Sequence, residues 1–132
     1  MTCYPCTADF ESLPTEMVFG DSMHWIVTFK DPDGVAIDTT GWVMYLILRD
    51  GIDLESSTFI RTITTTVPAG DEATAGKATI SLNAIDSKGI PIGDYYYEFK
   101  RVITSVDPTD VWTFASSSRL DFKVKPGTTV IP

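Results

Sequence analysis

Large apolar and polar residues alternate along this chain in short runs, and this alternation most constrains its fold. The clearest run has one apolar set and one mostly polar set: Met23, Trp25, Val27 and Phe29 alternate with His24, Ile26, Thr28 and Lys30. A period of two is typical of a half-buried β-strand, because successive side chains of a strand point to opposite faces of the sheet. The run ends at Asp31-Pro32-Asp33-Gly34, whose residue types favour a turn.

Further segments share this pattern or a strand-like composition and are separated by turn residues. The expected strands cover residues 16–19, 22–30, 42–49, 58–67, 77–82, 93–103 and 111–125, the last one interrupted by serines 116–118. Both faces of 42–49 are apolar, which predicts a central strand. Residues 68–76 are expected to form a polar loop, and Asn83 to cap one helical turn that ends near Gly89. The sequence therefore predicts an all-β fold, an immunoglobulin-like antiparallel β-sandwich of about seven strands.

The length of 132 residues suits one domain rather than two. The alternating segments place that domain at residues 13–125. Residues 1–12 are predicted to be an N-terminal arm, polar apart from Tyr4 and Phe10, and residues 126–132 a short C-terminal tail that contains Val130 and Ile131.

The net charge of −8 excludes some classes of partner. Proteins that bind nucleic acids or anionic membranes neutralise phosphates with clustered Lys and Arg, which this chain lacks, so neither partner is expected. No apolar run approaches the roughly 20 residues that span a bilayer. The first residues lack the basic and apolar regions of a signal peptide, so synthesis in the cytosol and a soluble product are expected.

Cys3 and Cys6 form a Cys-x-x-Cys pair, but the chain lacks the βαβ context of a thioredoxin-like site. A structural zinc ion needs four ligands, and Cys3, Cys6 and His24 offer three. A disulfide or a metal ion shared between chains is an alternative to the favoured interpretation, an unliganded arm. No cofactor and no metal site are predicted, and Cys3 and Cys6 are the nearest to metal-ligand candidates.

No catalytic site is predicted either. His24, the single histidine, is expected at the surface on the polar face of an edge-type strand, without a nucleophile and an orienting partner. The acidic connector with Asp31, Asp33 and Asp38 is attributed to turn chemistry rather than to calcium binding. The aromatic stripe at 95, 97 and 99 matches the inward period of its neighbours and is expected to be core rather than a sugar-binding platform.

Three stretches resemble small immunoglobulin-like domains of tailed-bacteriophage virions, the family related to the N-terminal domain of phage baseplate upper proteins. They are Gly20-Asp21-Ser22 followed by a strand and Lys30-Asp31-Pro32-Asp33-Gly34; Ile37-Asp38-Thr39-Thr40-Gly41-Trp42; and Gly76 to Leu82, the turn 83–91 and Ile92-Gly93-Asp94-Tyr95-Tyr96-Tyr97-Glu98-Phe99. The resemblance spans residues 18–125. The Cys-x-x-Cys segment is not part of the pattern.

The resemblance implies a non-enzymatic structural protein, made in the host cytoplasm and located in the virion. We expect an adaptor in the tail, neck or fibre-attachment region that binds other virion structural proteins in a symmetric, multi-copy assembly. Tyr4, Phe10, Val130 and Ile131 are the candidate partner-binding residues. The alternatives are a capsid decoration protein on the head exterior and a carbohydrate-binding adsorption module with Trp42, Trp112 or Tyr96 as its platform.

Overall fold

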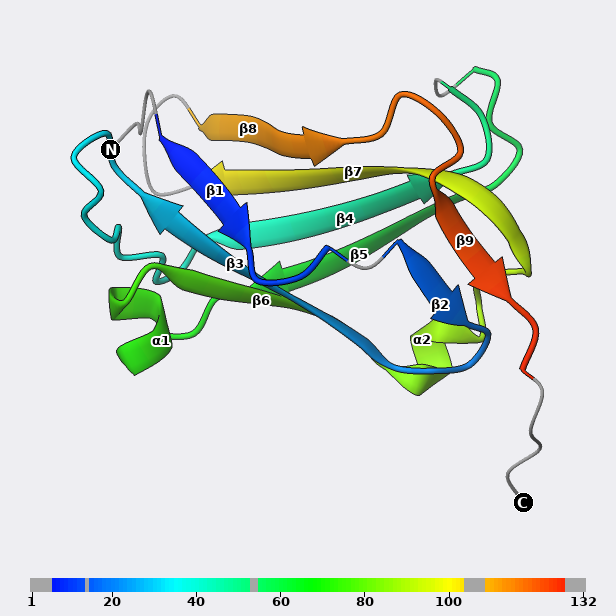
Figure 1. Cartoon of the computed structure of the whole chain (residues 1–132), viewed down its shortest axis with the longest axis horizontal. Helices are drawn as coiled ribbons and strands as arrows, with labels where there is room; N and C mark the ends of the chain where they lie inside the picture. Colours follow the sequence, from blue (N-terminus) through cyan, green and yellow to red (C-terminus); the bar gives the residue numbers. More distant parts are fainter. Residues whose placement is uncertain (1–5, 14, 53–54, 104–108, 128–132) are drawn as a thin grey trace.

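The computed structural model describes residues 6–13, 15–52, 55–103 and 109–127 (Figure 1). Its elements, in chain order, are β1 (Thr7–Phe10), β2 (Glu16–Val18), β3 (Met23–Lys30), β4 (Val43–Arg49), β5 (Ile60–Thr66), α1 (Asp71–Thr74), β6 (Lys77–Leu82), α2 (Ala84–Ser87), β7 (Gly93–Ile103), β8 (Asp110–Ser116) and β9 (Phe122–Lys125). Neither of these helices has the length and apolar character needed to cross a membrane.

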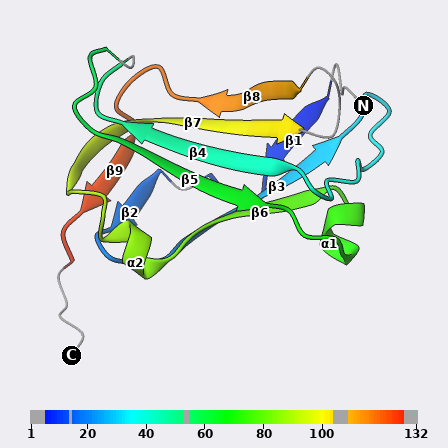
Figure 2. The same cartoon turned by 180° about the vertical axis from the view of Figure 1, so that it is seen from behind.

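Two sheets pack face to face, as Figures 1 and 2 show from opposite sides. The smaller sheet has the strand order β1-β3-β6, and the larger has the order β2-β9-β7-β4-β5, with β8 also paired to β7. All pairs are antiparallel except β2 with β9, which is parallel. The N-terminal part of the chain thus contributes β1 to one sheet and β2 to the other. The predicted immunoglobulin-like sandwich is confirmed, with nine strands in the described residues.

Strand β1 corrects the expected N-terminal arm. Residues 7–10 pair antiparallel with β3 in a continuous register that runs from Thr7 opposite Lys30 to Phe10 opposite Val27. Ala8 and Phe10 pack against the core, whereas the residues between and before them are exposed. The expectation that residues 7–10 lie outside the sandwich is therefore wrong. A four-residue strand is too short for its alternation to be distinguished from loop sequence.

The core consists mainly of the residues that alternation assigned to inward faces. Trp25, Val27 and Phe29 of β3 are fully buried, as are the inward residues of β4 and β6: Met44, Leu46, Leu48, Ile80 and Leu82. Strand β4 lies between β5 and β7, which confirms the predicted central strand. Strand β3 lies between β1 and β6 and is therefore not the edge strand that was expected for His24.

The final predicted strand is divided in two where its serine run falls. β8 pairs with the second half of β7 and β9 with its first three residues, so both lie along the same edge of β7. Between them, the Ser117 hydroxyl oxygen accepts a hydrogen bond from the Tyr97 N–H at 2.9 Å, while the Ser117 N–H donates to the Tyr97 carbonyl. The predicted interruption is confirmed, because a serine side chain here takes the place of a main-chain partner.

The start of β7 carries a structural signature of immunoglobulin-like domains. The hydroxyl of Tyr95, a buried side chain, donates a hydrogen bond of 2.6 Å to the carbonyl oxygen of Pro91, four residues upstream. Such a tyrosine corner is typical of the strand that follows the turn between the two sheets. The preceding turn is α2, where the Asn83 side chain accepts a hydrogen bond from the Asp86 N–H at 2.7 Å, so the predicted cap is confirmed.

Helix α1 corrects the polar loop expected at residues 68–76. Residues 71–74 form a helical turn whose Ala73 is buried. Thr39, itself fully buried, fixes this turn: its N–H donates to the Ala73 carbonyl at 3.1 Å and its hydroxyl donates to the Lys77 carbonyl at 2.8 Å. The polar composition of 68–76 concealed one inward-facing alanine, which was enough to pack the turn.

Candidate interaction site

Strand β5 forms one edge of the larger sheet, and none of the strands in the described residues pairs with its other side. It pairs with β4 over all seven residues without a register shift. At its two ends, the Val67 N–H donates to the carbonyl oxygen of Trp42, and the Asp50 N–H donates to the carbonyl oxygen of Phe59. Since hydrogen-bonded pairs alternate in an antiparallel ladder, the odd-numbered residues of β5 bond to β4. The even-numbered residues 60, 62, 64 and 66 therefore direct their N–H and C=O groups to the free side.

This edge lacks most of the features that usually protect edge strands. Such strands are commonly very short, bulged, or interrupted by Lys or Pro. β1 and β2 are short, β6 begins with Lys77, and the β7–β8 ladder contains a register shift. β5 is regular, consists almost entirely of β-branched residues and contains a single charge, Arg61. It is the described edge best suited to pairing with another strand.

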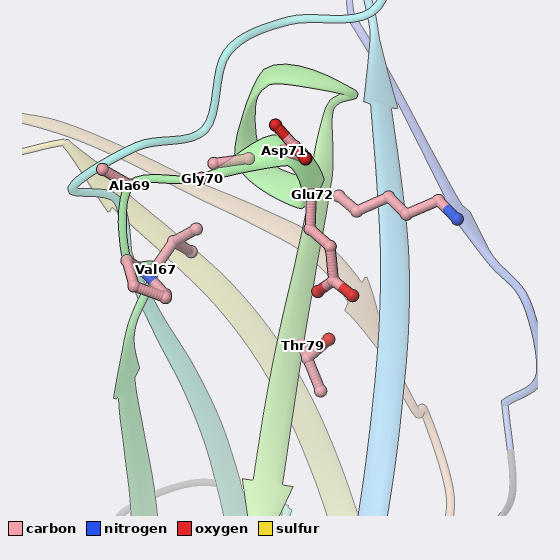
Figure 3. Close-up of a pocket in the computed structure, with 9 residues that line it drawn as sticks. Val67, Ala69, Gly70, Asp71, Glu72 and Thr79 are labelled. Carbon is pink, nitrogen blue, oxygen red and sulfur yellow. The ribbon is translucent and has the colours of Figure 1, made fainter.

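A hollow of about 270 Å³ adjoins the end of β5, next to α1 (Figure 3). Buried Val67 and Ala73 contribute to its walls, and the exposed Asp71, Glu72 and the half-buried Thr79 contribute polar groups. Figure 3 shows the Glu72 carboxylate reaching along β6 beside Thr79. The hollow thus combines an apolar part with carboxylates at its rim.

The charge balance at this hollow is negative. Lys77 also lines it, but its Nζ lies 3.5 Å from a carboxylate oxygen of Glu11, in an exposed ion pair. Lys77 is therefore already paired with Glu11, while the carboxylates of Asp71 and Glu72 lie at the rim of the hollow. A ligand with a positive charge and an aliphatic stem matches this lining, because the stem can contact Val67 and the charge can approach Glu72.

A second polar cluster lies inside the sandwich, at the end where β7 finishes and β8 begins. The Arg101 side chain is 1% exposed, and its guanidinium carbon lies 4.8 Å from the ring centroid of Trp42 and 5.2 Å from that of Trp112. Its Nη2 bonds Asp110 at 2.7 Å, whereas Nε and Nη1 have no hydrogen-bond partner. Burial lowers the pKa of Arg101, and the Asp110 carboxylate opposes that shift.

The alternation along β7 contains a signal for the burial of Arg101. Position 101 continues the inward alternation of 95, 97, 99 and 103 on β7, so strand geometry alone points its side chain inward. The charge argument had treated Arg101 only as one of the scattered basic residues of the chain. The free edge of β5 carried no comparable signal, because it depends on which strands become neighbours. The hollow lies within residues 67–79, where the polar composition indicated only a loop.

The predicted partner-binding residues are only partly described. Phe10 is half-buried, with its ring centroid 5.0 Å from that of Phe99 and 5.8 Å from that of Phe114. Phe10 therefore packs against the core of its own domain, and its role in binding a partner stays a prediction. Tyr4, Val130 and Ile131 lie outside the described residues.

Cys6 is disulfide-bonded, so the favoured expectation of an unliganded arm is wrong for this residue. Cys3, the other cysteine of the sequence, lies outside the described residues. A sulfur held in a disulfide is not available as a thiolate ligand. In the part of the chain that the structure describes, no three His, Cys, Asp or Glu side chains are grouped so as to hold a metal ion.

His24 is exposed on the outer face of the smaller sheet, as expected for its side chain. Its Nδ1 lies 2.9 Å from the hydroxyl of Ser81, the residue directly opposite on β6. Both side chains are exposed, and the structure records no carboxylate bonded to this imidazole within the described ranges. The pair is a cross-strand contact without the orienting group that nucleophilic catalysis needs.

The acidic connector shows turn chemistry. The Asp31 carboxylate accepts hydrogen bonds from the N–H groups of Asp33 and Val35, both at 2.9 Å. Asp38 accepts one from the Thr40 hydroxyl at 2.6 Å and another from the Thr40 N–H, and these bonds hold the pKa of Asp38 below its usual value. The carboxylates of Asp31 and Asp38 thus accept hydrogen bonds from backbone N–H groups of their own turns.

The aromatic residues proposed as a sugar platform are mostly engaged in the core. Trp42 is 6% exposed and Arg101 covers one of its faces, so the expectation that Trp42 offers an exposed platform is wrong. Trp112 and Tyr96 are half-buried. Tyr95 and Phe99 are buried, and the half-buried Tyr97 packs against Phe99 at a centroid distance of 5.8 Å. These contacts confirm the interpretation of the 95–99 stripe as core.

No known family model matches the sequence, and no curated protein matches it. Among solved structures, the chain is similar to parts of a β-glucosidase from Listeria innocua. The TM-score is 0.41 with 20% identity for the complex with glucose, 0.41 with 21% for the complex with gluconolactone, and 0.39 with 21% for the β-glucosidase alone. The aligned region covers 96% of this chain and 16% of each of those chains. A likeness at these scores carries no argument about function.

Proposed function

We propose that this protein is a non-enzymatic structural module of a tailed-phage virion, an immunoglobulin-like adaptor that binds other structural proteins in the tail, neck or fibre-attachment region. The observation that carries the proposal is the free, regular edge of β5 on a sandwich with a buried hydrophobic core. A domain of this kind is suited to docking through strand addition. The proposal also rests on the three stretches that resemble virion modules.

These stretches lie at structurally demanding points of the domain. The turn at Asp31 is closed by its own carboxylate, Thr39 holds α1 and β6, and Tyr95 forms the corner that starts β7. The hydrogen bonds of these side chains fix the framework of the sandwich. The resemblance therefore supports a scaffold with a binding role.

The test is to locate the chain in assembled particles. Particles are purified from a lysate of the source organism on a density gradient, and a gold-labelled antibody against the chain is visualised by electron microscopy. Label at the tail, neck or fibre base is the expected result. Label on the head exterior would favour the decoration alternative, and particles without the chain would overturn the proposal.

A further inference from the structure

The even-numbered residues of β5 face away from β4, and within the described part of the chain no main-chain hydrogen bond reaches this side. Their side chains are exposed, and β6 of the smaller sheet also contacts β5. Each of Ile60, Thr62, Thr64 and Thr66 presents an N–H donor and a C=O acceptor in the spacing of a β-ladder. A strand that pairs here would exchange water for main-chain hydrogen bonds.

Helices α2 and α1 stand at the two ends of this edge (Figure 2). At the start of β5, the Arg61 guanidinium lies 3.3 Å from the Asp86 carboxylate of α2. At its other end, Val67 and α1 enclose the hollow of about 270 Å³. A second copy of this chain would also carry a net charge of −8 and be repelled, which favours a different, basic partner over pairing between copies.

The hollow adds a requirement for one side chain of that segment. Its walls include Val67 and Ala73, and its rim carries the carboxylates of Asp71 and Glu72. The whole chain has a net charge of −8, which attracts a basic partner. A lysine or arginine side chain has the required aliphatic stem and positive head.

We infer that β5 binds an extended, basic segment of another virion protein, antiparallel to β5, with a Lys or Arg side chain of that segment in the hollow beside Glu72. This inference rests on the proposed function, since it names the kind of partner that the adaptor binds. Main-chain bonds along β5 would provide the affinity, and the hollow would select the basic side chain. Because antiparallel strands run in opposite directions, the basic residue lies near the N-terminal end of the bound segment.

The test uses the full chain, labelled with ¹⁵N, and a synthetic peptide, acetyl-Arg-Thr-Val-Thr-Val-Thr-amide. We expect a Kd on the order of 0.1–1 mM, because a short peptide has one side-chain anchor and must be ordered on binding. Amide signals of β5 and of residues 67–79 should shift. The N–H groups of residues 60, 62, 64 and 66 should exchange more slowly with solvent, which is specific for strand addition. Absence of binding, or binding without this protection, would overturn the inference.

Two matched peptides separate the contributions. Citrulline in place of Arg keeps the size and removes the charge, and should weaken binding about tenfold if a charge-assisted hydrogen bond is lost. Glu72→Gln should weaken the Arg peptide similarly and leave the citrulline peptide unchanged, whereas Asp94→Asn, an exposed carboxylate elsewhere, should change neither. If both peptides bound equally to every variant, the hollow would not select a basic side chain, and this part of the inference would be wrong. N-methylation of the valines should abolish binding without any change to the protein.

Thr64→Pro tests the edge from the protein side. The Thr64 N–H points away from β4, so proline here removes no β4 bond but blocks the free edge. Peptide binding should fall at least about tenfold, while Thr64→Val, which retains the N–H, should bind like the wild type. A folded Thr64→Pro variant that binds normally contradicts the inference, yet leaves particle incorporation of the wild-type chain unaffected. Conversely, peptide binding by a chain that is absent from particles would contradict only the proposed function.

Discussion

At the scale of single residues, two buried polar side chains of this domain make very different contacts. Tyr95 donates one hydrogen bond to a carbonyl four residues away, whereas Arg101 is enclosed by two tryptophans with a single carboxylate partner. The first is a local bond within one turn. The second joins β7 to the start of β8 and leaves two guanidinium nitrogens unpaired.

The tyrosine corner predicts a measurable loss of stability. Tyr95→Phe removes the hydroxyl and leaves the Pro91 carbonyl without this donor, so the free energy of unfolding should fall by about 1–1.5 kcal/mol. Urea denaturation followed by tryptophan fluorescence measures the change. Tyr45→Phe is the matched control, because Tyr45 lies on the half-buried outer face of β4 and should change stability by less than about 0.5 kcal/mol.

The Arg101 cluster predicts that loss of the Asp110 carboxylate lowers the free energy of unfolding more than loss of the Arg101 charge itself. Asp110→Asn leaves the buried guanidinium without its counter-ion and should lower the free energy of unfolding by about 2–3 kcal/mol. Arg101→Met removes the charge and its unpaired donors, and should fall within about 1 kcal/mol of the wild type or exceed it. The denaturation midpoints of both variants show which change lowers the stability more. A Met variant less stable than the Asn variant would show that contacts with the tryptophans dominate.

At the scale of elements, the connection between β4 and β5 is closed by Asp50. Its carboxylate accepts hydrogen bonds from the N–H groups of Thr58 and Phe59, at 2.7 and 2.9 Å, and from the Thr58 hydroxyl. The bond from the Thr58 hydroxyl contributes most to holding the pKa of Asp50 below its ordinary value of 3.8. The same carboxylate raises the pKa of Tyr95, although burial is the larger cause of that shift.

The lowered pKa of Asp50 predicts that the stability of the domain falls with pH in the acidic range. The contribution of the Asp50 carboxylate is complete above pH 3.8, the unfolded value, and is lost as the pH falls through the lower folded value. Asp50→Asn should therefore be less stable than the wild type at neutral pH, and the difference should shrink below pH 3.8. Thermal unfolding across this range measures the effect. Asp33→Asn, an exposed turn carboxylate, should run parallel to the wild type.

At the scale of the whole molecule, the N-terminal segment belongs to the sandwich. β1 is one of three strands in the smaller sheet, and Phe10 links it to Phe99 of β7 and Phe114 of β8. Any experiment that removes this segment to test assembly will also affect folding. Loss of binding on truncation therefore does not by itself identify a binding arm.

Deletion of residues 1–12 should destabilise the domain by more than the single change Phe10→Ala. For the half-buried Phe10, that change should cost about 2 kcal/mol, below the range for fully buried phenylalanines. The deletion also removes the ladder between β1 and β3, so its denaturation midpoint should be lower still. A truncated chain with wild-type stability would mean that β1 contributes nothing to the fold.

How far the sequence predicts this molecule depends on how local each feature is. The alternation of β3, β6 and β7, the central position of β4 and the Asn83 cap were all predictable, because each depends on side chains a few residues apart. β1 and α1 were missed, because each buries only one or two residues and its local pattern is too short to recognise.

What the sequence determined by itself is the class of fold: period-two alternation leaves no helical face to bury, so the chain forms sheets that pack their apolar sides together. What only the tertiary structure decided is which edge stays open. The free side of β5 depends on the order of the strands in its sheet, and Arg101 is buried between Trp42 and Trp112, which lie far apart in the chain. Their contacts arise from strand order and layer packing, which no local pattern contains.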